Sequence, residues 1–153
     1  MNMSADTIDV LIVEDTPEDL ELTLEALSEH MPLSRIEVTR DGEEALHFLY
    51  GADGESPRAT LPRVVLLDIK LPKVDGLEVL ERIRQHPSTI ELPVVLLTSS
   101  AHESDLHRGY QLHANSYIVK PVQYEDFVAA VTEIGLYWLN RNRAPTRAES
   151  ALP

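Results

Sequence analysis

The stretch Val64-Val65-Leu66-Leu67-Asp68 decides the fold that the sequence predicts, because four apolar residues run directly into a carboxylate. A short apolar run with β-branched residues is typical of a strand buried on both faces, as in a parallel sheet with helices above and below. Such strands end at the carboxyl edge of the sheet, where α/β proteins place their ligands. We therefore expect Asp68 at the mouth of a crevice; the alternative is that it only caps the next turn.

Composition limits the classes of function. The chain has 153 residues, which predicts one domain, and it has no cysteine for disulfides, thiolate metal sites or a cysteine nucleophile. Its formal net charge of −13 predicts no nucleic-acid partner, because phosphates would repel it. No apolar stretch is long enough to cross a bilayer, and residues 1–6 do not resemble a signal peptide. We expect a cytoplasmic protein with no membrane partner.

Apolar runs and helical patterns alternate along the rest of the chain. The expected strands are 8–13, 36–39, 64–68, 93–97 and 116–119, and helices begin near residues 17, 42, 76, 103 and 124, the last reaching about Asn142. This alternation predicts an α/β fold with a doubly wound, five-stranded parallel sheet and helices on both faces. We expect an N-terminal arm at 1–7, one domain at 8–142 and a disordered tail at 143–153.

The connection at 51–63 is longer than most loops of α/β proteins, which predicts either a flexible insertion or a binding loop.

Chemically active side chains follow four of the five predicted strands. Glu14 and Asp15 follow the first strand, and Thr98 and Lys120 follow the fourth and fifth. Thr16 and Asp19 form a predicted helix cap, which leaves the two carboxylates before them free for a divalent cation. The alternative is that these carboxylates serve the following helix.

The ends of parallel strands meet at one edge of the sheet, so these residues are expected to converge on Asp68. Three carboxylates could hold one Mg²⁺, and a lysine and a hydroxyl could hold the oxygens of a transferred phosphoryl group. Asp68 could then act as a carboxylate nucleophile and form an acyl phosphate. The sequence therefore predicts phosphoryl transfer to Asp68.

The chain resembles the receiver domains of two-component response regulators over about residues 8–140. The residues that carry the resemblance are Glu14-Asp15, Asp68 with Pro72 and Gly76, Thr98, Tyr117 and Lys120-Pro121. The loop at 51–63 and the run at 67–76 are similar to those of small single-domain regulators that partner bacterial phytochromes. The resemblance implies the flavodoxin-like (βα)5 receiver fold.

It also implies a role for each matching residue. Glu14, Asp15, Asp68 and the backbone carbonyl of Lys70 would bind Mg²⁺. Asp68 would accept the phosphoryl group from a sensor histidine kinase, and the similarity to the regulators of phytochromes implies a kinase of the phytochrome type. Lys120 would pair with one phosphoryl oxygen. The resemblance makes the chain a phosphoacceptor that assists its own phosphorylation and dephosphorylation, rather than an enzyme.

The implied switch uses Thr98, which would move to a second phosphoryl oxygen and make room for Tyr117 to rotate. The signal would be read on the surface around the fourth and fifth helices. The family usually has a cis peptide between Lys120 and Pro121. Lys70 and Ser100 flank the site and would tune the lifetime of the phosphoryl group.

The last helix has more apolar residues than one face requires. Its predicted core stripe is Phe127, Val131, Ile134 and Trp138, and the apolar residues outside it are Val128, Leu136, Tyr137 and Leu139. This excess predicts a homodimer through the last helix and the fifth strand. The alternative is a core that wraps unusually far around the helix.

Two other functions compete with the phosphorylation switch. A flavodoxin-like nucleotide or flavin binder would need a phosphate cradle after the first strand, where Glu14-Asp15 stands instead. A pseudo-receiver that serves as a constitutive docking module would be expected to lack some of the site residues, and this chain has all of them.

Overall fold

The computed structural model describes residues 7–145, so most of the predicted arm at 1–7 and tail at 143–153 lies outside the described residues. The strands are β1 (Val10–Val13), β2 (Ile36–Thr39), β3 (Val64–Leu67), β4 (Val94–Thr98) and β5 (Ser116–Val119). The helices are α1 (Pro17–Ser28), α2 (Gly42–Tyr50), α3 (Gly76–Gln85), α4 (Glu103–Gln111) and α5 (Tyr124–Leu136). A 3₁₀ turn, η2 (Leu33–Arg35), precedes β2, and a π turn, η3 (Tyr137–Arg141), continues α5. Within this part of the chain, no helix is long and apolar enough to cross a membrane.

The five strands form one parallel sheet in the order β2-β1-β3-β4-β5, which confirms the predicted doubly wound topology. β3 lies at the centre because its four residues, all apolar, are buried on both faces. Leu67, its last residue, pairs with Val13 on one side and Leu96 on the other. Successive strands are added on one side of β1 (β2) and then on the other (β3 to β5), so the switch point lies between β1 and β3, and the residues after these two strands open into its crevice.

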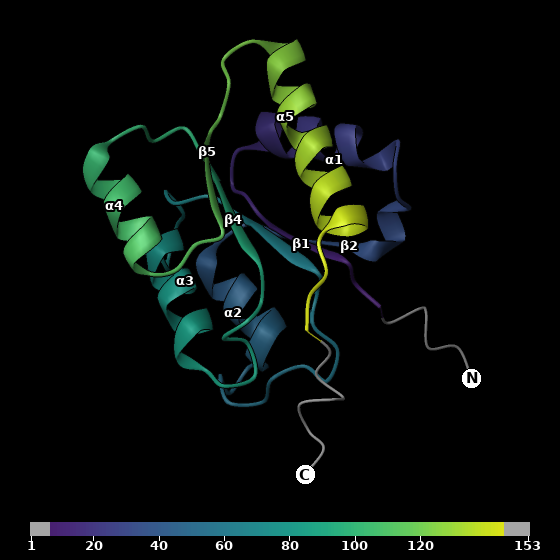
Figure 1. Ribbon diagram of the computed structural model, residues 1–153. Helices are drawn as coiled ribbons and strands as arrows, with labels where there is room; N and C mark the ends of the chain where they lie inside the picture. Colours follow the sequence, from purple (N-terminus) through teal and green to yellow (C-terminus); the bar gives the residue numbers. More distant parts are fainter. Residues whose placement is uncertain (1–6, 146–153) are drawn as a thin grey trace.

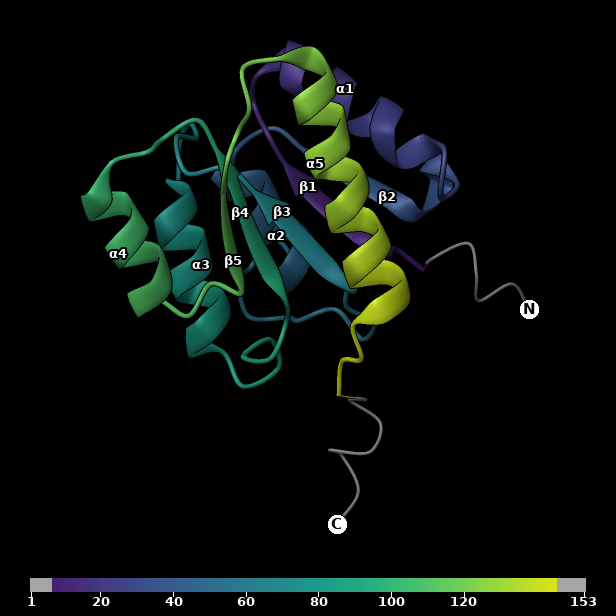
Figure 2. The same cartoon turned by 45° about the horizontal axis from the view of Figure 1, so that its top comes forward.

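Two helical layers cover the sheet, with α1 and α5 on one face and α2, α3 and α4 on the other (Figures 1 and 2). Alternate residues of β1 supply the two cores, since Leu11 and Val13 pack under α2 and α3, and Val10 and Ile12 pack under α1 and α5. α4 contributes little to its core, because Gly109 is its one buried residue. α4 thus has the fewest buried residues of the five described α-helices.

The end of the last helix differs from the prediction. A regular helix would place Trp138 in the core and Leu139 outside it, but Leu139 is buried and Trp138 is only half-buried. The π turn causes this difference, because its wider turn shifts the following side chains by about one position. Leu136 and Tyr137 remain 39% and 51% exposed, as expected of residues outside the core stripe.

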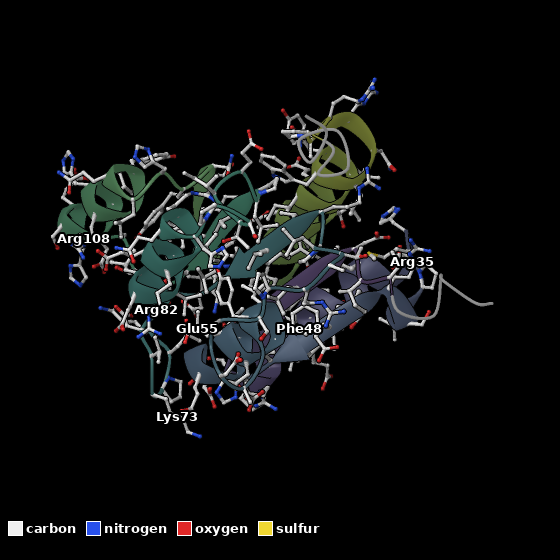
Figure 3. The ribbon with its side chains drawn as sticks, turned by 90° about the horizontal axis from the view of Figure 1, so that it is seen from below. Arg35, Phe48, Glu55, Lys73, Arg82 and Arg108 are labelled. Atoms are coloured by element: carbon white, nitrogen blue, oxygen red, sulfur yellow. The ribbon has the colours of Figure 1, made fainter. Side chains whose placement is uncertain are left out.

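The connection at 51–63 folds back on the end of α2. The amides of Ser56 and Arg58 donate hydrogen bonds to the carbonyls of Tyr50 and Leu49. The Arg58 guanidinium lies 4.1 Å from the centre of the Phe48 ring, on the side of the molecule seen in Figure 3. The main-chain bonds and the cation–π contact favour an ordered insertion over a flexible one.

Candidate functional site

Lys120 is the centre of the site that the sheet edge forms. Its amide donates a hydrogen bond to the Thr98 carbonyl, which fixes the residue at the end of β5. Its ammonium nitrogen lies 2.7 Å from Glu14 Oε1, 2.8 Å from Asp19 Oδ2 and 2.9 Å from Asp68 Oδ2. An ammonium has three N–H donors, so all three are used. The structure therefore brings the ends of β1, β3 and β5 together around one buried cation.

Carboxylates outnumber the cation at this edge. Glu14, Asp15 and Asp68 each present an oxygen within 4.8 Å of the others. With Asp19 there are four carboxylates around one ammonium, a formal charge of 1 − 4 = −3 when all are ionised. Mg²⁺ prefers such carboxylate oxygens, and an excess of negative charge favours a divalent cation. The donor set therefore fits Mg²⁺.

The crowding shifts two pKa values. Burial raises the pKa of Glu14 to about 7; the charge of Asp68 adds to this increase and the contact with Lys120 opposes it. Burial alone would lower the pKa of Lys120, but its contacts with Asp19, Glu14 and Asp68 outweigh burial and raise it. Lys120 is thus fully charged, and Glu14 takes up a proton near neutral pH.

The main chain around Asp68 is held by close packing. Asp68 Oδ1 accepts a hydrogen bond from the amide of Ile69 at 2.7 Å, and the Gly76 amide donates to the Ile69 carbonyl at 2.8 Å. A Cβ at Gly76 would overlap the main-chain oxygen of Asp68, so only glycine allows α3 to start this close. Gly42 likewise lets α2 approach Val74. These two glycines fix the loop that follows the acceptor carboxylate.

Three details differ from the predictions. Thr16 stands at the start of α1, but its side chain makes no capping bond; its amide instead donates to Glu14 Oε2 at 3.1 Å. Asp19 points to Lys120 rather than forming a capping box, because a buried cation is a stronger partner than a neutral amide. The Lys120–Pro121 peptide is trans, the form that X–Pro bonds favour, and not cis as the resemblance implied.

The proposed switch residues lie next to each other. Thr98 is fully buried at the end of β4, and its hydroxyl oxygen accepts a hydrogen bond from the Ser100 amide at 3.2 Å. The Tyr117 hydroxyl donates to the Ser100 carbonyl at 2.9 Å, and burial raises the pKa of this phenol. Ser100 therefore links the threonine to the tyrosine.

Sequence reasoning missed two acidic residues of the site, Asp19 and Asp105. Asp105 Oδ2 accepts a short hydrogen bond of 2.6 Å from the Ser100 hydroxyl and lies 3.6 Å from the ammonium of Lys70. Both aspartates stand in the first turn of a helix that follows a strand, at the carboxyl edge of the sheet. That placement was readable from the sequence, but acids in a first turn are also common as simple partners of the helix dipole.

The hollow that Glu14 and Asp68 line is too small for a flat aromatic cofactor. The hollow behind Glu14 and Asp68 has a volume of about 10 Å³. A larger groove of about 350 Å³ lies between α3 and α4, with Arg82 and Arg108 among its lining residues (Figure 3), but none of the predicted site residues lines it. Ligand pockets for organic molecules usually start near 300 Å³ and are mostly apolar. The geometry therefore argues against the flavin-binding alternative.

Known proteins show the same architecture. The Methanothrix harundinacea protein described as the probable methanogenesis regulatory protein FilR2 is 44% identical, over 89% of this chain and 86% of its own length. Response regulator Rcp1 of Synechocystis is 38% identical over 89% of this chain and 92% of its own length. The Mn²⁺-bound structure of Rcp1 has a TM-score of 0.80 at 37% identity, covering 91% of this chain and 99% of that one.

A third relative is known in its phosphorylated form. The crystal structure of the phosphorylated cyanobacterial phytochrome response regulator RcpA has a TM-score of 0.82 at 36% identity, covering 92% of this chain and 99% of that one. Residues 10–132 of the present chain match the family described as response regulator receiver domain. This match covers most of the chain, and it includes every residue of the predicted site. The chain therefore belongs to the response regulator receiver domain family.

Proposed function

We propose that Asp68 accepts a phosphoryl group from a phosphohistidine of a sensor kinase. The observation that carries the proposal is the placement of Asp68, a buried carboxylate whose Oδ2 lies 2.9 Å from Lys120. One oxygen of Asp68 would attack the phosphorus, the P–N bond would break, and the imidazole nitrogen would leave with the electron pair. Lys120 would neutralise charge on a phosphoryl oxygen, as positively charged groups do in phosphoryl transfer.

Glu14, Asp15, Asp68 and the backbone carbonyl of Lys70 would hold Mg²⁺. When bound, the ion would neutralise the charge that a phosphoryl group adds to an already acidic site. The oxygen cluster within 4.8 Å supports this assignment, and the Mn²⁺-bound form of Rcp1 is a relative with a divalent cation.

Thr98 and Tyr117 would report phosphorylation to the surface. Thr98 can donate its hydroxyl to a phosphoryl oxygen only by moving toward Asp68, and this movement would loosen its bond with the Ser100 amide. Tyr117 would change position together with Ser100, because the Tyr117 hydroxyl donates a hydrogen bond to the Ser100 carbonyl. The readout would be the surface of α4, β5 and α5, in which α4 is the weakly anchored helix.

The kinase is proposed to be of the phytochrome type, because RcpA is a phytochrome response regulator and is similar over nearly its whole length. The same proposal locates the protein in the cytoplasm and excludes nucleic acid as a partner, given the net charge of −13. It also includes assistance to phosphorylation and dephosphorylation by the chain's own site residues.

A homodimer through α5 and β5 is part of the proposal. Four large apolar side chains of these elements and their junction are 43–98% exposed: Val119, Val122, Tyr124 and Tyr137. Such a surface is typical of an interface. Sedimentation with and without a phosphate mimic tests it, and a monomer at high concentration in both conditions would exclude the dimer.

The test of the acceptor is intact mass after incubation with acetyl phosphate. We expect a Mg²⁺-dependent gain of one phosphoryl group in the wild type and in Asp75→Asn, a control in the same loop, and no gain in Asp68→Asn. Uptake by Asp68→Asn at the wild-type rate would remove Asp68 from its role. No gain in any protein would favour the pseudo-receiver that acts as a docking module.

A further inference from the structure

Asp105 joins the two side chains that flank the acceptor site. It lies in the first turn of α4, and its side chain is 16% exposed. One of its oxygens, Oδ2, is 2.6 Å from the Ser100 hydroxyl and 3.6 Å from the Lys70 ammonium. A single carboxylate oxygen therefore holds a neutral donor from the end of β4 and a cation from the loop after β3.

The serine is held at every polar atom. Besides its bond to Asp105, Ser100 donates a hydrogen bond from its amide to the Thr98 hydroxyl oxygen, and its carbonyl accepts one from the Tyr117 hydroxyl. Its hydroxyl oxygen also accepts a longer bond of 3.4 Å from the amide of His102. The bond to Asp105 is the strongest of these, because it is short and its acceptor carries a charge.

Lys70 is held much less firmly. Its side chain is 69% exposed, and the ion pair with Asp105 lies in water rather than in the core. Lys70 stands only two residues after Asp68, on a long and flexible stem. A phosphoryl dianion on Asp68 would therefore compete with Asp105 for this ammonium.

We propose that Asp105 is a positioning residue that shortens the lifetime of the phosphoryl group on Asp68 by keeping the Lys70 ammonium turned away from it. This inference rests on the proposed function of Asp68. In hydrolysis, water attacks the phosphorus, the bond from phosphorus to the Asp68 oxygen breaks, the carboxylate leaves with the electron pair, and a proton of the water passes to solvent.

The direction of the effect follows from how water reaches the phosphorus. Water must attack in line with the bond to Asp68 that breaks, from the side of the phosphoryl group opposite that bond. Lys120 is buried, whereas Lys70 comes from the solvent side, so a Lys70 ammonium and stem lying on the phosphoryl group would cover the approach of water and slow hydrolysis. Asp105 opposes that by giving Lys70 another partner.

The experiment measures the half-life of the phosphoryl group. Protein phosphorylated with acetyl phosphate and Mg²⁺ is freed of the donor by rapid desalting, and intact mass is followed over time. We expect Asp105→Asn to lengthen the half-life about threefold to fivefold, the range that exposed ion pairs can reach. Adding Lys70→Ala to Asp105→Asn should return most of this gain, a dependence that a merely structural role of Asp105 would not produce.

The matched control is Glu103→Gln. Glu103 lies in the same turn of α4, its side chain is 80% exposed, and it pairs with His107 instead of the site. We expect it to leave the half-life unchanged. An unchanged or shorter half-life in Asp105→Asn, or a longer one that persists without Lys70, would overturn the inference alone. A wild type that takes up no phosphoryl group would overturn the proposed function and the inference with it.

Discussion

Replacing Lys120 with methionine should destabilise the metal-free protein far more than an ordinary surface change. Methionine is unbranched and long enough to fill the space of the lysine stem, so the change mainly removes charge. It leaves Glu14, Asp19 and Asp68 without the cation they share. The side chains of Lys120, Glu14 and Asp68 are only 5–6% exposed, so water cannot take the place of that cation.

The magnitude follows from the distances. At 2.8 Å and an effective dielectric constant of about 20, one such contact is worth about 6 kcal/mol before the cost of burial. Burial of the charges takes back much of this energy, and removing one partner from a buried ion pair usually costs about 3–5 kcal/mol. We expect a loss of that size at pH 7.5. It should shrink toward pH 5, because Glu14, whose pKa burial raises to about 7, is then protonated and no longer needs the cation.

The assay is urea unfolding in EDTA and again in excess Mg²⁺. Mg²⁺ should recover more stability in Lys120→Met than in the wild type, since it supplies the missing positive charge. Lys73→Met is the control, because Lys73 also faces two carboxylates but is 61% exposed, and it should cost less than about 1 kcal/mol. Equal stability of Lys120→Met and wild type in EDTA at pH 7.5 would refute this account of the site.

Three further outcomes are expected. Burial raises the pKa of Glu14 from 4.5 to about 7, so the stability that this residue contributes is complete below pH 4.5 and is lost as pH rises through 7. Thermal unfolding of the metal-free protein should show this loss of stability, up to about 3 kcal/mol, between these pH values. The pH dependence should disappear in Glu14→Gln. Gly76→Ala should cost at least about 2 kcal/mol in urea unfolding, because its Cβ meets main chain, whereas Gly54→Ala should cost about 1 kcal/mol from its positive φ alone. Arg84→Met should cost about 2–3 kcal/mol by the same method, because it removes the arginine donor from three main-chain carbonyls and leaves the Asn115 amide oxygen with the Val94 amide alone.

The sheet and most of the site could be predicted because both depend on strands that are short, apolar and parallel. The runs that end at Val13, Leu67 and Val119 needed no tertiary information, and their parallel pairing forces Glu14, Asp68 and Lys120 to one edge. The bounds of β2 and β5 agree with the prediction to the residue, and β3 ends at Leu67, one residue before the predicted end at Asp68.

The residues that the sequence did not place correctly depend on contacts and helix geometry that a local sequence pattern does not show. Asp19 looks like a capping residue in the sequence. Its ion pair with Lys120 depends on the position of α1 relative to the sheet edge, which the sequence pattern does not show. Asp105 depends in the same way on the placement of α4. Leu139 was misassigned because one π turn changes the register of a helix without any change in its apolar pattern.

The occupied donors of Lys120 suggest how a phosphoryl group would change the site. All three of its N–H groups are used, so the ammonium can reach a phosphoryl oxygen only by releasing one carboxylate. Asp68 is the partner expected to let go, because formation of the acyl phosphate removes the negative charge of its carboxylate. The contacts to β1 and α1 would then survive, and the change would fall on the side of Thr98. On that side, α4 buries only Gly109 in the core and contacts the site through Asp105. With so few contacts, α4 is the helix expected to move most easily.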